Sequence, residues 1–211
     1  LSGYSEPKRW NRLVLAAIWL RNKFLMLIRR EADHARAGRP ARIVAKMNSL
    51  CDREIIEALY EASAAGVKID LIIRGICCLK VGIPKVSEHI TVRSLVGTFL
   101  EHSRIFYFQN GDQEEVYMGS ADWMPRNLDK RVEILFPVED PDLKEEVKHI
   151  LDIQLADTLK AHELNSDNVY EKIDKRGKAL LGAQAYFCEE ARERAKREAD
   201  PALSRVFIPA E

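Results

Sequence analysis

A histidine and an arginine lie two residues apart at the start of an apolar run, in the segment "FLEHSRIFYFQN" (99–110). A second apolar run, "EVYMGSA" (115–121), leads into Ser120 and then Asp122. Imidazole accepts or donates a proton or bonds covalently to phosphorus, and guanidinium groups pair with phosphate oxygens. If the fold brings His102, Arg104, Ser120 and Asp122 together, they have the chemistry of a phosphoryl-transfer site.

The dipeptide Asn110-Gly111 between these two runs is a strong signal for a β-hairpin. Such a hairpin returns the end of the second run to the start of the first, so Ser120 is expected close to Arg104. Residues two apart on a strand share a face, which places the side chains of His102 and Arg104 together. A lone histidine is usually structural, but these neighbours favour a functional role.

Three further polar residues end two expected parallel strands, 41–48 ("ARIVAKMN") and 67–75 ("VKIDLIIRG"). They are Lys46, Asn48 and Arg74, and ligands of open α/β sheets bind beyond the carboxyl ends of such strands. Lys46 and Asn48, two apart, are expected on one face, although a lone lysine here is more often one that reaches solvent from an edge strand. Arg74 follows a continuous apolar run, so it needs an anion or a water-filled cleft.

More basic residues follow the Gly-Ser pair, and Arg131 among them opens the next expected strand. Arg126 and Arg131 extend the candidate cluster, whereas Lys130 is interpreted as solvated. Ser49 is a candidate N-cap that would direct helix N–H groups toward an anion, although simple capping by Ser49 or Asp52 explains that stretch equally well.

The elements that must position these residues alternate along the chain. The expected helices are 19–37, 52–66, 140–159 and 189–199, and the expected strands are 13–18, 41–48, 67–75, 90–96, 104–109, 115–121 and 131–138. The strand–helix–strand unit over 41–75 implies a right-handed parallel crossover. The pattern therefore predicts an α/β fold.

The composition is that of a globular chain without a dominant charge. Its 33 basic and 33 acidic side chains balance, so an anion site must come from local clustering and nucleic acid is not an expected partner. The four cysteines have no CxxC spacing, which favours a reducing cytoplasm. No apolar run is long enough to span a bilayer, and the start at Leu1 favours a piece of a larger protein.

The pattern His-x-basic, strand, turn and Gly-Ser-x-Asp resembles the signature of the phospholipase D superfamily. Four blocks in order, "IVAKMNSL", "DLIIRGICCL", "FLEHSRIFYF" and "GSADWMPRNLDKRVE", resemble the C-terminal region of bacterial polyphosphate kinases of the first type, over about residues 3–162. The resemblance implies a phospholipase-D-like α/β domain with a mixed, largely parallel sheet flanked by helices. It also implies three parts: the end of a preceding catalytic domain (1–18), the phospholipase-D-like domain (19–165) and a charged, partly helical tail (166–211).

The same resemblance implies reversible transfer of the terminal phosphate of ATP to inorganic polyphosphate, with Mg²⁺ and a phosphohistidine carried by the preceding domain. His102 would assist the transfer, Arg74 and His102 would contact the phosphates, and Arg131 would line the same tunnel. No metal ligand is assigned. The full set of residues expected at the substrates is Lys46, Asn48, Arg74, His102, Arg104, Ser120, Asp122 and Arg131.

The expected partners are ATP or ADP, polyphosphate and the preceding domains, with a homo-oligomer as the full enzyme. The cytoplasm is the expected location, with the membrane surface as a second site. The isolated fragment is expected to be inactive, because the phosphorylated histidine is missing from it.

Departures from the phospholipase pattern count against lipid hydrolysis: Arg104 replaces lysine, Gln109 stands in place of aspartate, Asp122 replaces asparagine and the Gly-Ser pair comes three residues late. Two alternatives remain open. One is a phosphodiesterase that unites two His-x-Arg copies in a dimer. The other is a groove for single-stranded nucleic acid with Tyr107 and Trp123 as stacking platforms.

Overall fold

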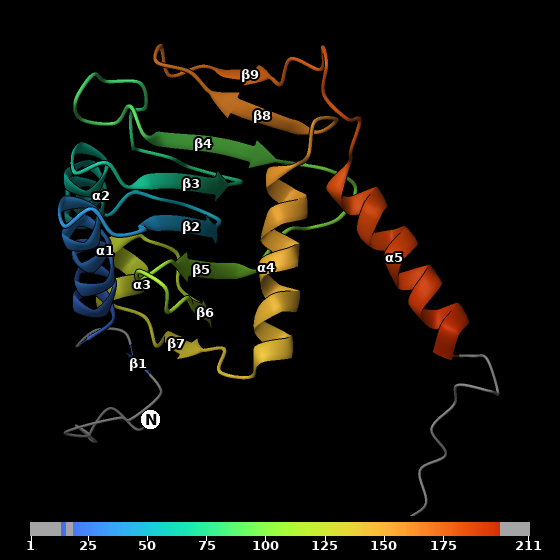
Figure 1. The fold of residues 1–211 in the computed structure, drawn as a ribbon, viewed down its shortest axis with the longest axis horizontal. Helices are drawn as coiled ribbons and strands as arrows, with labels where there is room; N and C mark the ends of the chain where they lie inside the picture. Colours follow the sequence, from blue (N-terminus) through green and yellow to red (C-terminus); the bar gives the residue numbers. More distant parts are fainter. Residues whose placement is uncertain (1–13, 16–18, 199–211) are drawn as a thin grey trace, which may run out of the picture.

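The computed structural model describes residues 14–15 and 19–198, which form one sheet with helices on both faces (Figure 1). The strands are β1 (Val14–Leu15), β2 (Arg42–Met47), β3 (Lys68–Ile73), β4 (Ile90–Leu95), β5 (Arg104–Phe108), β6 (Glu115–Gly119), β7 (Ile134–Pro137), β8 (Ala161–Leu164) and β9 (Tyr170–Lys172). The helices are α1 (Leu20–Arg36), α2 (Arg53–Ala64), α3 (Pro125–Asp129), α4 (Pro141–Leu155) and α5 (Ala183–Glu198). The strand order is β1-β7-β6-β5-β2-β3-β4-β8-β9.

The predicted mixed sheet flanked by helices is confirmed, but the prediction that it is largely parallel is wrong. Only β2–β3 and β3–β4 pair in parallel within the described sheet, and the other six pairings are antiparallel. A parallel pair needs a long crossover, and β5 to β7 and β8 to β9 instead follow one another as antiparallel neighbours. The parallel centre is therefore short.

The expected crossover is present, with α2 between β2 and β3. Asp52 is the N-cap of α2, and its side chain accepts a hydrogen bond from the Ile55 N–H at 3.1 Å. The expectation that Ser49 caps this helix is wrong, because Asp52 directly precedes the first turn and takes that role. Gly66 adopts a φ of 95° after the helix, a conformation that favours glycine, and turns the chain into β3.

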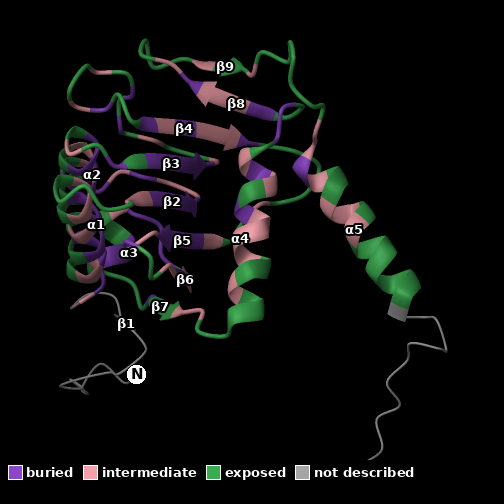
Figure 2. Ribbon diagram, viewed as in Figure 1, coloured by how far each residue is buried: buried purple, intermediate pink, exposed green. Residues whose placement is uncertain are grey.

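Two hydrophobic cores lie on opposite faces of the sheet. α1 and α2 cover one face, where Phe24 packs against Phe106 and Trp123 with ring centroids 4.7 and 5.4 Å apart. α4 covers the other face, where Leu151 packs with Ile105 and other buried side chains. The alternation of β5 between the cores follows from the two-residue period of a strand. Figure 2 shows the buried residues concentrated along the strands and the inward sides of these helices.

The predicted hairpin joins β5 and β6. Asn110 and Gly111 both have positive φ, 48° and 65°, and the Asn110 N–H donates to the buried Glu31 carboxylate of α1 at 2.8 Å. The pairing starts at Phe108 and Glu115 and ends with Arg104 opposite Gly119. The hairpin therefore returns the Gly-Ser segment to the start of β5, as predicted.

The sheet continues past residue 165, because β9 pairs with β8. The expected helix at 189–199 begins earlier, at Ala183, and α5 packs beside α4 (Figure 1). The proposed division of the chain at residues 18 and 165 stays a prediction. Of the expected strand at 13–18, β1 pairs with β7, and residues 13 and 16–18 lie outside the described residues. None of the helices in the described ranges combines the length and apolar character that a bilayer crossing needs.

Candidate functional site

Three chain segments meet where β2, β3 and β6 end. Leu50 forms isolated bridges with both Cys77 and Trp123, and the Gly75 N–H donates to the Asn48 carbonyl at 2.8 Å. A Cβ at Gly75 would lie 3.0 Å from that carbonyl oxygen, so the close approach favours glycine. The residues that follow β2, β3 and β6 therefore lie together at one edge of the sheet, the edge formed by the ends of these strands. β5 begins at the same edge.

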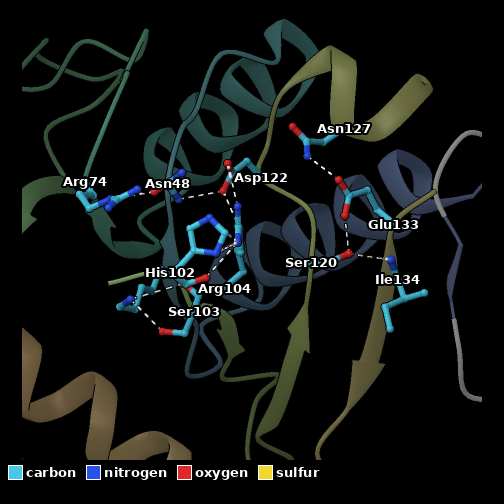
Figure 3. A network of polar contacts seen from close by, with 11 residues as sticks. Asn48, Arg74, His102, Ser103, Arg104, Ser120, Asp122, Asn127, Glu133 and Ile134 are labelled. Carbon is cyan, nitrogen blue, oxygen red and sulfur yellow. Dashed lines mark hydrogen bonds and ion pairs between the residues drawn. The ribbon is translucent and has the colours of Figure 1, made fainter. Parts of the chain in front are cut away.

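A chain of hydrogen bonds at this edge joins five residues, here called the histidine–arginine cluster: Asn48, Arg74, His102, Arg104 and Asp122 (Figure 3). Arg74 Nε donates to Asn48 Oδ1 at 2.8 Å, and the Asn48 N–H donates to Asp122 Oδ1 at 2.8 Å. Arg104 donates to both oxygens of Asp122, at 3.0 and 3.3 Å. Its Nη1 lies 2.9 Å from His102 Nδ1, so the cluster is continuous.

Arg104 fixes His102 in two ways. Nη1 also donates to the His102 carbonyl oxygen at 2.9 Å, so one guanidinium holds both the backbone and the ring. A guanidinium has donors only, so a ring nitrogen bonded to it acts as an acceptor. His102 precedes β5 rather than lying within it, which differs from the expected strand position, but its side chain still meets Arg104.

Within the cluster, the Arg74 guanidinium is the cation without an ion pair among the described residues. Asp122 is buried and ion-paired to Arg104, so its charge is already balanced within the fold. Arg74 is half-buried and His102 is exposed. Among the described residues no partner is found for Nη1 and Nη2 of Arg74. These donors remain available to an anion, and guanidinium groups suit phosphate oxygens in particular.

Lys46 lies beside the cluster but has its own partners. It is 2% exposed, and its Nζ donates to Ser103 Oγ at 2.8 Å and lies 3.2 Å from a Glu101 oxygen. Burial lowers the pKa of Lys46, and the Glu101 carboxylate opposes this shift. The alternative of a lysine reaching solvent from an edge strand is wrong, because β2 lies between β3 and β5. Asn48 falls beyond the end of β2, so the expected shared strand face does not form.

Ser120 turns away from the histidine–arginine cluster (Figure 3). Its Oγ accepts the Ile134 N–H at 3.2 Å and donates to the buried Glu133, which also accepts from Asn127 Nδ2 at 2.6 Å. This second group ties the loop between α3 and β7 to the segment that carries Asp122. Ser120 therefore makes structural contacts, and its expected role at the substrates stays a prediction.

Arg131 lies on this same loop with an exposed side chain. Its backbone N–H donates to the Arg126 carbonyl at 3.1 Å. No hydrogen bond or ion pair joins its side chain to the cluster within the described part of the chain. The role of Arg131 at the phosphates stays a prediction.

Sequence reasoning missed four polar residues around the site: Glu101, Ser103, Glu133 and Gln184. Glu133 carried a usable signal, because a glutamate directly before an apolar strand must find partners if the strand is buried. Ser103 accepts a hydrogen bond from Lys46 Nζ, a contact between distant segments of the chain that local sequence does not indicate. Gln184 lies over eighty residues further along the chain from its partner Phe99, so no local pattern points to it.

The described residues do not offer a site for a metal ion held by protein ligands. They contain no group of three or more His, Cys, Asp and Glu side chains placed to hold one. The carboxylate of the cluster, Asp122, is ion-paired to Arg104. The Mg²⁺ implied by the resemblance therefore has no assigned ligand among residues 14–15 and 19–198.

Each of three comparisons with known proteins finds polyphosphate kinases. A family model described as "Polyphosphate kinase C-terminal domain 2" matches residues 13–184. A polyphosphate kinase of Synechocystis sp. is 52% identical over 207 residues, which are 98% of this chain and 28% of that protein. One of Thermosynechococcus vestitus is 54% identical over 172 residues, 82% of this chain and 24% of that protein.

The crystal structure of polyphosphate kinase from Porphyromonas gingivalis matches with a TM-score of 0.86 and 42% sequence identity, covering 91% of this chain and 30% of that chain. The chain thus spans less than a third of the length of these relatives. The family model, by contrast, covers most of the chain. The chain therefore belongs to the polyphosphate kinase family, in which it corresponds to the C-terminal domain.

Proposed function

We propose that this chain is the phosphate-handling part of a polyphosphate kinase, which reversibly transfers the terminal phosphate of ATP to inorganic polyphosphate. The observation that carries the proposal is the hydrogen-bonded path from Arg74 through Asn48 and Asp122 to Arg104 and His102. Phosphoryl transfer depends mainly on positioning and on stabilising charge, and this path places cationic donors from separate strands at one edge.

The residues of the cluster divide into those that touch phosphate and those that hold them. The unpartnered Nη groups of Arg74 bind phosphate oxygens, and the exposed imidazole of His102 exchanges a proton or a hydrogen bond with them. Arg104 orients His102, while Asn48 and Asp122 fix the two arginines. Arg131 approaches the same phosphates from its exposed loop.

Lys46 and Ser120 support the residues that bind phosphate. Lys46 places a positive charge behind the loop of residues 96–103, which carries His102. Ser120 supports the loop between α3 and β7, which carries Arg131, through Glu133. The phosphohistidine forms outside this chain. The chain alone therefore binds ATP and polyphosphate but does not catalyse phosphate transfer between them. The proposed partners are ATP or ADP with Mg²⁺, polyphosphate, the preceding domains of the parent protein and further copies of it, in the cytoplasm or at the membrane surface.

Isothermal titration with long-chain polyphosphate tests the proposal directly. The double variant Arg74→Ala plus Arg131→Ala is compared with Arg29→Ala plus Arg39→Ala, which removes the same charge from exposed residues of α1 and of the loop before β2. We expect the first variant to lose at least about tenfold in affinity, since each charge-assisted contact contributes about 1.5–3 kcal/mol. The control variant is expected to bind like the wild type.

Equal affinities for both double variants would contradict the proposed site. Hydrolysis of a chromogenic phosphodiester by a verified dimer, abolished in His102→Ala, would instead favour the phosphodiesterase alternative. The salt concentration is held constant across all titrations, because binding of a polyanion falls steeply with salt.

A further inference from the structure

The loop that carries His102 has little backbone structure of its own. Residues 96–103 connect β4 to β5 without helix or strand, and no backbone–backbone hydrogen bond involves them within the described part of the chain. Phe99 and Leu100 are exposed, so apolar packing does not fix the loop either. Side chains from other elements must therefore hold His102 in place.

Gln184, in the first turn of α5, provides the most extensive of these contacts. Its Oε1 accepts the Phe99 N–H at 3.0 Å, and its Nε2 donates to the Phe99 carbonyl at 2.8 Å. Nε2 also lies 3.1 Å from Glu101 Oε1, so one side chain contacts the loop at three points. The Gln184 amide thus makes with Phe99 the two hydrogen bonds that the backbone of a neighbouring strand would otherwise make.

Glu101 extends these contacts to the residue directly before His102. Its Oε2 accepts from Gln154 of α4 at 2.9 Å and pairs with Lys46 of β2 at 3.2 Å. Lys46 in turn donates to Ser103, directly after His102. Both sequence neighbours of His102, Glu101 and Ser103, are thus held by side chains of other elements. Glu101 is also the neighbour that contacts Gln184.

The loop and the start of α5 are shaped for this glutamine. A Cβ at Gly97 would lie 2.3 Å from Gln184 Oε1, so a larger residue there would displace the amide. The start of α5 is itself anchored, because the Ala183 N–H donates to the buried Asp157 at 2.7 Å. Gln184 therefore reaches the loop from a fixed position.

We infer that Gln184 is a positioning residue that couples helix α5 to the placement of His102. The inference rests on the proposed function and deepens it, because it makes the C-terminal helix part of the phosphate site. Gln184 touches no substrate; it acts by ordering residues 97–103. Loss of the amide frees the loop and reduces the share of molecules in which His102 stands beside Arg104.

Hydrogen exchange of the Phe99 N–H, which donates to Gln184 Oε1, and polyphosphate affinity together test the inference. Gln184→Met keeps the length of the side chain and removes its hydrogen bonds, whereas Gln184→Glu keeps an acceptor for the Phe99 N–H but opposes Glu101 and the Phe99 carbonyl. Glu189→Gln, an exposed position on the same helix whose ion pair is with Arg192, is the matched control. We expect the Phe99 N–H to exchange about tenfold faster in Gln184→Met than in the wild type, less so in Gln184→Glu, which keeps an acceptor, and at the wild-type rate in the control.

A double-mutant cycle separates positioning of His102 from a general structural role. Gln184→Met should weaken polyphosphate binding about three- to tenfold in the wild type and leave binding unchanged when His102→Ala is already present. The same loss of affinity in both backgrounds would overturn the inference, as would unchanged exchange of the Phe99 N–H in Gln184→Met. Failure of the wild type to bind polyphosphate would contradict the proposed function, while the exchange measurement would still decide whether Gln184 orders the loop.

Discussion

Asp122 is the residue on which the histidine–arginine cluster depends most. Its two oxygens hold Arg104 and the Asn48 backbone N–H, and both Asp122 and Arg104 are largely buried. Removing one partner of a buried ion pair leaves an uncompensated charge, which is more costly than the pair itself is stabilising. The Asp122 carboxylate therefore holds the Arg104 guanidinium in place.

Asp122→Ala is expected to lower the free energy of unfolding by about 3–5 kcal/mol, because it leaves Arg104 buried without its partner. Asp122→Asn retains an oxygen for the Asn48 N–H and should lose less. Urea unfolding followed by circular dichroism measures both. Stability of Asp122→Ala equal to that of the wild type would show that the ion pair does not hold the cluster.

Lys46 predicts a dependence of stability on pH. Burial lowers its pKa in the folded chain below the ordinary value of 10.5, so between the two values the unfolded chain binds more protons. The stabilising contribution is therefore present above pH 10.5 and is lost as the pH falls through the folded pKa. Relative to Lys46→Met, the wild type should gain stability as the pH rises toward 10.5.

Urea unfolding of both proteins at several pH values from 8 upward checks the Lys46 prediction. The difference between them isolates Lys46, because other groups titrate in both. A difference that stays constant or shrinks with rising pH would mean that burial of the lysine is not reflected in its ionisation.

At the scale of elements, local signals in the sequence identified most of the parts. The Asn110-Gly111 turn predicted the β5–β6 hairpin, and the apolar periodicity of 52–66 predicted α2. The short polar runs of β8 and β9 gave no comparable signal, because those strands lie at one end of the sheet and take their structure from pairing. The balance of parallel and antiparallel pairs was mispredicted for a similar reason, since strand order is set by contacts between distant segments.

The same distinction holds within the candidate site. Arg74 was identifiable because it is a costly residue at the end of an apolar run, and His102 and Arg104 because they lie two residues apart at the start of another. The partner of Ser120 was not, because Glu133 is on another strand end and the contact needs the paired β6 and β7. Tertiary hydrogen bonds to side chains are therefore the part that a single sequence leaves open.

Gly119 tests how closely β6 and β7 must approach to hold this part of the site. A Cβ at Gly119 would lie 2.5 Å from the Ile134 carbonyl oxygen, so Gly119→Ala must push the strands apart. We expect Gly119→Ala to lower the free energy of unfolding by about 1–3 kcal/mol, the usual range when a larger side chain is forced into a packed site. Gly182→Ala, whose Cβ would meet only Leu159 side-chain atoms at 3.5 and 3.8 Å, is the control. Equal melting temperatures for the two variants would contradict this packing.

At the scale of the whole molecule, charge is distributed unevenly although the formal net charge is zero. The histidine–arginine cluster presents cations at one edge of the sheet. On the side of α4 and α5, a cavity of about 380 Å³ is lined by Glu101, Glu146 and Glu190 and by the single arginine Arg194, so acidic side chains outnumber basic ones there. A polyanion is therefore expected to follow the Arg74 side of the His102 loop and to avoid the helical groove.

The chain corresponds to less than a third of its relatives, so its own contribution is best measured as binding. The most direct measurement is a titration of the isotope-labelled chain with polyphosphate, followed by NMR. The proposed site predicts that the signals of Asn48, Arg74, His102 and Arg104 shift together with one affinity, while those of His149 and Glu190 in the helical groove stay in place. Shifts centred on the groove, or no saturable shift at Arg74 and His102, would contradict it.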